Sequence, residues 1–110
     1  MSQRATANNG DQLLEALAAL ASPHRLRIIA ALANGGRNYV SQLARELQIS
    51  RPLLHLHLQK LESAGLVTSK LELSQDGKAL KYFEVRSFEL LLSPAAIARA
   101  AKSLTSKSEP

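Results

Sequence analysis

Polar and basic side chains recur on one face of the segment 50–64, and their chemistry suits a polyanion. If this segment is a helix, Leu54, Leu58 and Leu61 share one side and predict the face that is buried. The opposite side carries the residues that stay free to bind: Pro52, His55, Leu56, Gln59 and Ser63, with Arg51 at the start and Lys60 at the edge. We therefore expect a binding surface on the outward face of a helix that Ser50 caps.

Arg51 has the strongest binding chemistry in this set. Its guanidinium can donate two parallel hydrogen bonds to O6 and N7 of guanine, which is worth about 1–3 kcal/mol of discrimination between bases. It can equally hold a phosphate, because half or more of protein–DNA hydrogen bonds go to the backbone. His55 has the same two kinds of partner, or only water. The sequence leaves these alternatives open.

Two leucines on this helix lie where polar residues are expected. Leu56 falls opposite the buried stripe, and Leu53 lies outside it. An apolar side chain in the major groove can contact a thymine methyl group. It can also pack on a partner protein, or the helix can be rotated from the orientation that the stripe predicts.

The histidines do not predict a metal site. His55 and His57 are two residues apart, so they do not face each other on a helix. His57 lies about 60° from the centre of the leucine stripe, given a turn of about 100° per residue, and is predicted to be a packed structural histidine. His24, at the start of an earlier helix, is predicted to lie on the surface.

Composition narrows the class of protein. The chain has 110 residues, of which 45% are hydrophobic, and this suits one domain with a core of its own. It has no cysteine, which excludes disulfides, thiolate metal sites and cysteine nucleophiles. No Ser/His/Asp triad and no glycine-rich phosphate loop is evident, so we expect neither an enzyme nor a cofactor. Fourteen Lys and Arg against nine Asp and Glu give a net charge of +5, which favours a polyanionic partner.

Start and stop signals divide the chain into five helices and one hairpin. We expect a disordered tail over 1–10, one domain over 11–104 and a second disordered tail over 105–110. The helices are expected to begin at five caps: Asp11, Ser22 before Pro23, Asn38, Ser50, and Ser93 before Pro94. Glycines 35, 36 and 65 mark helix ends. The predicted fold is mainly α (α+β), in the order ααααββα.

The segment 66–86 predicts the hairpin. Asp76-Gly77 separates two strand-like stretches, and glycine supplies the positive φ that a tight turn needs. Lys78 near the tip is the best candidate to bind a phosphate or a minor groove. The alternative is that lysines on this hairpin only keep the strands soluble and discourage edge pairing.

The helices before and within 50–64 are joined by only Gln48, Ile49 and Ser50, which is typical of a helix-turn-helix, and the hairpin is then its wing. The same order contains Ser22-Pro23 with Arg25, Ile28-Ile29, Leu43-Ala44 with Leu47, Ser50-Arg51-Pro52, His57-Leu58, Leu61 and the stretch AGLV at 64–67. Through these residues the chain resembles the ArsR-type winged helix-turn-helix transcription regulators over residues 12–86.

The resemblance implies a homodimer that binds double-stranded DNA and regulates transcription, more often as a repressor. The helix at about 50–64 would enter the major groove, and the wing at about 66–86 would contact the backbone or the minor groove. Ser50, Arg51, Pro52, Leu53, His55, Leu56, Gln59, Lys60 and Lys78 are the predicted DNA-binding residues. Arg37 and Arg45 would join them only if folding brings them together.

The chain departs from the family at its sensor sites. Arsenic-sensing members carry two cysteines near the start of the third helix, where this chain has Tyr39 and Ser41. Other members bind zinc or nickel through His and acidic residues of the last helix, and the segment 94–104 has none. We therefore expect no metal site, and any effector is unknown.

The first and last helices carry apolar faces with no assigned cover, and such faces usually mark an interface. In the family these helices form the dimer contact, which implies that the dimerisation residues are Leu13, Leu17, Leu20, Ile97, Ala101 and Leu104. The alternative is that each stripe completes the protomer's own core.

Two other functions compete with DNA binding. A winged helix can serve as a protein–protein interaction module, and Leu53 and Leu56 favour that role. RNA binding is less favoured because only 4% of the residues are aromatic. No apolar stretch approaches the roughly 20 residues that span a bilayer, so we expect no membrane partner and a cytoplasmic protein. Arg51 and the basic charge favour DNA.

Overall fold

A computed structural model of the chain describes residues 5–6 and 9–105. Five helices carry the architecture: α1 Gly10–Leu20, α2 Pro23–Gly35, α3 Val40–Leu47, α4 Arg51–Ser63 and α5 Pro94–Ala101. The strands are β1 Ala5–Thr6, β2 Asn38–Tyr39, β3 Val67–Leu73, β4 Ala79–Val85 and β5 Phe88–Glu89. The predicted order of four helices, a hairpin and a last helix is confirmed.

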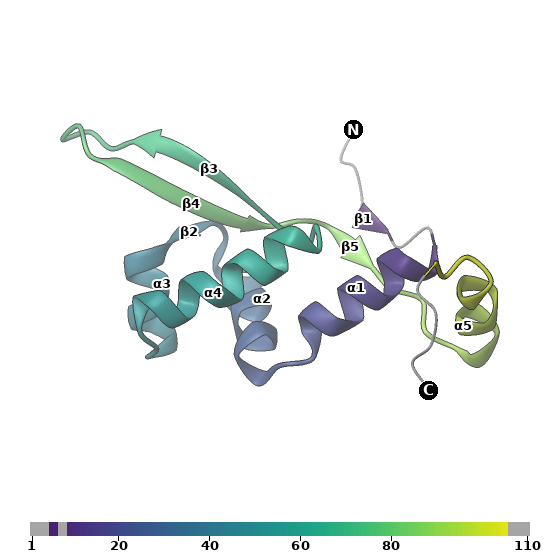
Figure 1. Cartoon of the computed structure of the whole chain (residues 1–110). Coiled ribbons are helices and arrows are strands. Elements are labelled where there is room, and N and C mark those ends of the chain that lie inside the picture. The colour runs from purple at the N-terminus through teal and green to yellow at the C-terminus, as the bar shows by residue number, and fades with distance from the viewer. Residues whose placement is uncertain (1–4, 7–8, 106–110) are drawn as a thin grey trace.

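The protomer is elongated, with extents of 52 × 36 × 22 Å. In Figure 1 the β3–β4 hairpin reaches out at one end, above α3 and the start of α4, while α5 lies at the opposite end beside the start of α1. The start of α1 and all of α5, which belong to the helices predicted to form a dimer, therefore lie at the opposite end from the wing and α3, while the end of α1 reaches α4.

A serine cap with a proline one or two residues later begins three of the helices, as predicted. Ser22, Ser50 and Ser93 accept hydrogen bonds from the backbone N–H three residues ahead, at 3.3, 3.2 and 3.1 Å. The proline in each first turn has no N–H. It therefore leaves no unpaired backbone donor at a position where the helix offers no acceptor. These caps fix where α2, α4 and α5 begin.

Two predicted caps are wrong. Asn9 caps α1 by accepting from the backbone N–H of Gln12 at 2.8 Å, and the Asp11 carboxylate instead accepts from Thr105, at 3.0 Å from its N–H and 2.7 Å from its hydroxyl. Asn38 does not cap α3, because it pairs with Phe83 as part of β2. Both errors come from partners that are far away in sequence.

One core joins α1, α2, α3, α4 and the inner half of the hairpin. Its fully buried large side chains are Ile28, Leu32, Leu43, Leu54, Leu58, Leu61, Val67 and Phe83. The sheet has the order β2-β4-β3, and β4 supplies Phe83 from its centre. The predicted stripe on α4 is confirmed, because Leu54, Leu58 and Leu61 have no exposed surface.

The hairpin is longer than the core that covers it. It is antiparallel from Val67 opposite Val85 to Leu73 opposite Ala79, and Gly77 turns it with a φ of 83°. Val67 is buried, but Leu71 and Leu73 on the same side of β3 are 68% and 76% exposed. The sequence pattern of alternating residues therefore continues past the point where anything packs on it.

The predicted tails fall partly outside the described residues, namely at 1–4, 7–8 and 106–110. Ala5–Thr6 pair in parallel with Phe88–Glu89, while Asn9 and Gly10 begin α1. Within the described chain no single helix has the length and apolar content to cross a membrane; α1 and α2 satisfy both only as a pair bent by 95°.

We expect Gly10→Ala to destabilise the docking of α5 on α1. A Cβ at Gly10 would collide with the carbonyl oxygen of Ala100 and would lie 2.9 Å from Cγ of Leu104. Overpacking of this kind costs about 1–3 kcal/mol. Thermal unfolding followed by circular dichroism measures the effect. Gly35→Ala is the matched control, because a Cβ there meets nothing within 4 Å; equal melting temperatures for the two variants would contradict the tight contact.

Candidate nucleic-acid interface

The predicted binding residues of α4 share an exposed surface. Leu53 is 37% exposed and Leu56 is 59% exposed. The other predicted members on this helix and its cap are exposed as well: Ser50, Arg51, Pro52, His55, Gln59 and Lys60. The structure thus brings them onto the outward side of α4, opposite the buried leucines, as the helical spacing predicts.

A tight turn sets the direction of α4 relative to α3. Gln48 ends α3 with a φ of 58°, the left-handed conformation that glycine adopts most readily. Its backbone N–H donates to the carbonyls of Ala44 and Arg45, and Ile49 N donates to Ala44 O at 3.1 Å. No glycine marks this turn, so its length could be predicted but its left-handed conformation could not.

Arg25 holds α4 to the end of α1. Its Nε donates to the carbonyl oxygen of Ala19 at 2.5 Å, and its Nη1 lies 3.0 Å from Nδ1 of His57. One side chain at the start of α2 therefore joins the end of α1 to the middle of α4. The prediction that His57 is a packed structural histidine is confirmed.

His57 must be neutral at Nδ1 to accept this hydrogen bond. Burial first, and then the charges of Arg25, His24 and Lys60, lower the pKa of His57 below its ordinary value of 6.5. The His24 ring lies 5.1 Å from it, so His24 is half-buried at this junction and not simply on the surface as predicted. Nε2 of His57 is buried and has no hydrogen-bond partner among the described residues.

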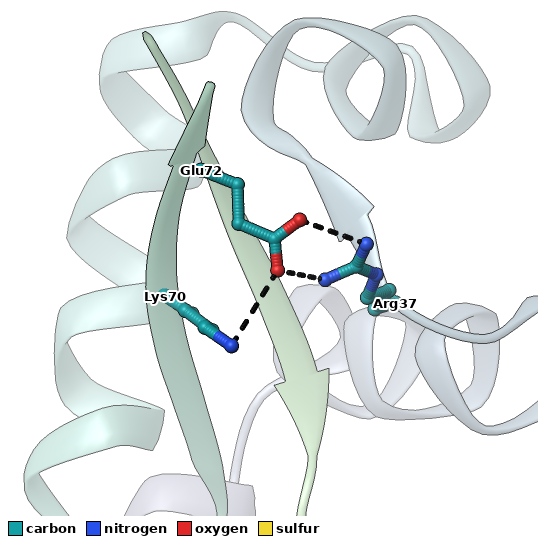
Figure 2. Close-up of polar contacts among 3 residues, drawn as sticks. All are labelled: Arg37, Lys70 and Glu72. Carbon is teal, nitrogen blue, oxygen red and sulfur yellow. Dashed lines mark hydrogen bonds and ion pairs between the residues drawn. The ribbon is translucent and has the colours of Figure 1, made fainter. Parts of the chain in front are cut away.

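A second arginine braces the wing. Arg37 donates from Nη1 and Nη2 to the two carboxylate oxygens of Glu72 on β3, at 2.5 and 3.0 Å, and Lys70 lies 3.8 Å from the same carboxylate (Figure 2). The Arg37 guanidinium also lies 4.3 Å from the centre of the Tyr82 ring. The hydrogen bonds from Arg37 lower the pKa of Glu72. Arg37 thus holds the hairpin to the segment before β2, and its charge is already paired.

Lys78 is exposed beside the hairpin turn, as predicted. Its backbone N–H donates to the Ser74 hydroxyl at 3.0 Å, and its carbonyl accepts from Ser74 N at 2.7 Å. The turn is therefore held by backbone bonds, and the ammonium group takes no part in them.

A groove lies between α4 and the end of α1, and no sequence pattern predicted it. Its lining residues are Glu15, Ala18, Ala19, Arg25, Leu56, Gln59, Lys60, Ser63 and Ala64. Three of the predicted DNA-binding residues, Leu56, Gln59 and Lys60, thus belong to this groove, whereas Arg51, Pro52 and His55 do not line it.

Exposed apolar side chains lie on α1, on α5 and on the segments just before and after α5. They are Leu14, Leu91, Leu92, Ile97 and Leu104. Of the predicted dimerisation residues, Ala101 is also exposed, Leu17 and Leu20 are half-buried, and Leu13 is only 9% exposed inside the protomer. Leu14, Leu91 and Leu92 were not predicted, although the three consecutive leucines at 90–92 could have signalled them.

In the part of the chain that the structure describes, no group of three or more His, Asp or Glu side chains could hold a metal ion.

Residues 22–69 match a family model described as "Bacterial regulatory protein, arsR family". An uncharacterized HTH-type transcriptional regulator of Methanocaldococcus jannaschii is 36% identical over 74 residues, which are 67% of this chain and 76% of that protein. Residues 22–69, which match the family model, contain the helix-turn-helix and the start of the wing.

Solved structures show the same architecture. One is the homodimeric winged helix-turn-helix DNA-binding domain of a possible ArsR-family transcriptional regulator from Mycobacterium bovis. It is 27% identical with a TM-score of 0.61, over 81% of this chain and 70% of that one. The transcriptional regulator HlyU from Vibrio vulnificus is 27% identical with a TM-score of 0.56, over 84% and 83% of the two chains.

The junction at His57 predicts a loss of stability in mild acid. Because folding lowers the pKa of His57, the unfolded chain binds its proton first. The stability that neutral His57 contributes to the folded state is complete above pH 6.5, the ordinary pKa of histidine. It is lost as the pH falls below that value and through the lower pKa of the folded state. Urea unfolding at closely spaced pH values between about 7.5 and 5.5 measures this slope.

His57→Gln should flatten the slope in this pH range, whereas His55→Gln, on the exposed side of the same helix, should preserve it. An equal slope in the unsubstituted protein and in His57→Gln would show that the junction does not titrate with folding.

Proposed function

Because this chain belongs to the ArsR family of helix-turn-helix regulatory proteins, we propose that it acts as a homodimeric, sequence-specific repressor of transcription. Members of this family are transcription regulators and not enzymes. The single observation that carries the proposal is the exposed outward side of α4, with Arg51 at its capped start and the wing extending at the same end of the molecule (Figure 1).

The start of α4 is suited to the major groove. Recognition helices contact base edges mainly through their N-terminal residues, and here those are Ser50, Arg51, Pro52 and His55. The side chains of Arg51 and His55 are exposed and make no hydrogen bond or ion pair within the described chain, so their donors are available. We assign base or phosphate contacts to them, and a thymine methyl contact to Leu53.

The wing is suited to the DNA backbone or the minor groove beside α4. Lys78 brings an ammonium group to the hairpin tip, and Arg37 with Glu72 holds the hairpin to the body of the domain. A braced wing fixes the distance between Lys78 and α4, so that both can engage one DNA duplex without a large loss of conformational entropy.

A dimer through α1 and α5 supports this mode of binding. The exposed Leu14, Ile97 and Leu104 give the apolar surface for a second copy, and the Mycobacterium bovis domain is itself homodimeric. Twofold symmetry would place the two copies of α4 about 34 Å apart, one turn of DNA. Such a dimer covers its operator in the cytoplasm and keeps other proteins from that DNA, which favours repression.

One observation favours a second function. Leu56 is 59% exposed on the outward side of α4, where a partner protein could also pack. A winged-helix module of that kind would show no preference among DNA sequences, so the experiment with Arg51 described next separates the two functions.

We expect Arg51→Ala to weaken binding to a DNA site enriched from random duplexes. If Arg51 contacts guanine, the loss is about 5- to 150-fold, equivalent to 1–3 kcal/mol. If it holds a phosphate, the loss is the same on all sequences and the slope of log K against log salt falls by about 1. Fluorescence anisotropy across a salt series measures both quantities.

Arg99→Ala is the matched control for Arg51→Ala. It removes the same charge from α5, at the other end of the molecule (Figure 1), and should change the affinity little. Equal affinities for the two variants, with no preference over bulk DNA, would overturn the proposed DNA-binding surface.

The double substitution Leu14→Glu, Ile97→Glu should yield a monomer. Two carboxylates placed in an apolar contact raise the dimer dissociation constant on the order of a hundredfold or more. Both side chains are exposed in the protomer, so the fold should survive. Sedimentation equilibrium measures the mass. Leu71→Glu on the wing is the control, and a double variant that remains as dimeric as this control would contradict the interface.

A further inference from the structure

We infer that the groove between α1 and α4 binds a small zwitterion of the α-amino-acid type, and that this ligand competes with DNA. The competition, but not the ligand site, rests on the proposed function of α4. The groove brings together side chains from three helices: Glu15, Ala18 and Ala19 of α1, Arg25 of α2, and Leu56, Gln59, Lys60 and Ser63 of α4.

The charges in the groove are of both signs. Arg25 and Lys60 are cationic and suit a carboxylate, and Glu15 is anionic and suits an ammonium group. A phosphate or a simple organic acid would satisfy the two cations but would be repelled by Glu15. A simple amine would pair with Glu15 but would be repelled by the two cations. A molecule with both groups complements all three side chains.

The binding groups are not used inside the protomer. The side chains of Glu15, Gln59 and Lys60 make no hydrogen bond or ion pair with the described residues. Arg25 uses Nε and Nη1 to hold Ala19 and His57, which fixes its guanidinium in place while its Nη2 has no partner among the described residues. A guanidinium that is already ordered loses little entropy when it binds a carboxylate.

The remaining lining explains an apolar residue on the outward side of α4. Leu56, with Ala18, Ala19 and Ala64, gives the groove an apolar surface beside its charged groups, since all of them line it. That surface suits the aliphatic part of an amino acid, whereas Gln59 and Ser63 offer further hydrogen bonds. Leu56 then serves the groove, and its exposure needs no protein partner.

Competition with DNA follows from shared residues. Gln59 and Lys60 belong both to the groove and to the proposed DNA-binding side of α4. A ligand that engages them withdraws them from DNA, and by linkage DNA lowers the affinity for the ligand by the same factor. The groove thereby gives a cysteine-free chain an effector site.

Binding is tested first without DNA. The ¹⁵N-labelled protein is titrated with a mixture of the twenty common L-amino acids and then with each alone. We expect saturable chemical-shift changes for at least one of them, centred on the backbone amides of Ala18, Ala19, Leu56 and Ser63. The N-acetyl derivative, which lacks the ammonium group, and the amide derivative, which lacks the carboxylate, should both bind more weakly.

Glu15→Gln should weaken this binding by about tenfold, as expected for loss of one charge-assisted hydrogen bond. Glu84→Gln, an exposed carboxylate on β4 outside the groove, is the charge-matched control and should bind as the unsubstituted protein does. Absence of saturable shifts with every amino acid, or shifts with inorganic phosphate alone, would overturn the ligand site.

The second experiment adds the enriched DNA site to the ligand titration. Saturating ligand should lower DNA affinity in the unsubstituted protein and much less in Glu15→Gln. If the ligand binds but DNA affinity does not change, the competition is overturned while the site stands. If the protein binds no preferred DNA, the proposed function fails independently of the ligand result.

Discussion

The three leucines that α4 buries, Leu54, Leu58 and Leu61, have no exposed surface, and the rest of the structure depends on where they lie. They belong to the common core, and α4 contacts α1, α2, α3 and β3, so α4 cannot rotate without opening that core. Because a helix has two sides, burial of one side presents the other to solvent. Arg51, His55 and Gln59 are exposed together for this reason, and not because they interact with one another.

Two arginines then position α4 and the wing: Arg25 bonds to α4, and Arg37 bonds to β3. Arg25, at the start of α2, joins the end of α1 to His57 on α4, and Arg37 joins the segment before β2 to Glu72 on the wing. Neither arginine is free to bind DNA with its full set of donors. Part of the positive charge of this basic chain is therefore paired within the protomer. The cations on α4 and at the hairpin tip stay exposed and are the ones proposed to bind DNA.

Much of the fold could be predicted because its signals are local. Ser22, Ser50 and Ser93 cap helices within three residues, and the α4 stripe repeats every three or four residues. What the sequence could not give were contacts between distant segments. Asp11 bonds Thr105, Asn38 pairs with Phe83, and the α1–α4 groove forms only when residues about 40 apart in sequence meet. Exposure of Leu71 depends likewise on where the core ends.

We propose that two copies of α4 bind one DNA duplex from the same side. Hydroxyl-radical footprinting of the protein on an enriched duplex tests it most directly. We expect two protected segments on one face of the DNA, related by twofold symmetry and centred about 10–10.5 base pairs apart or a multiple of that spacing. One protected segment, or uniform protection along the whole duplex, would contradict it.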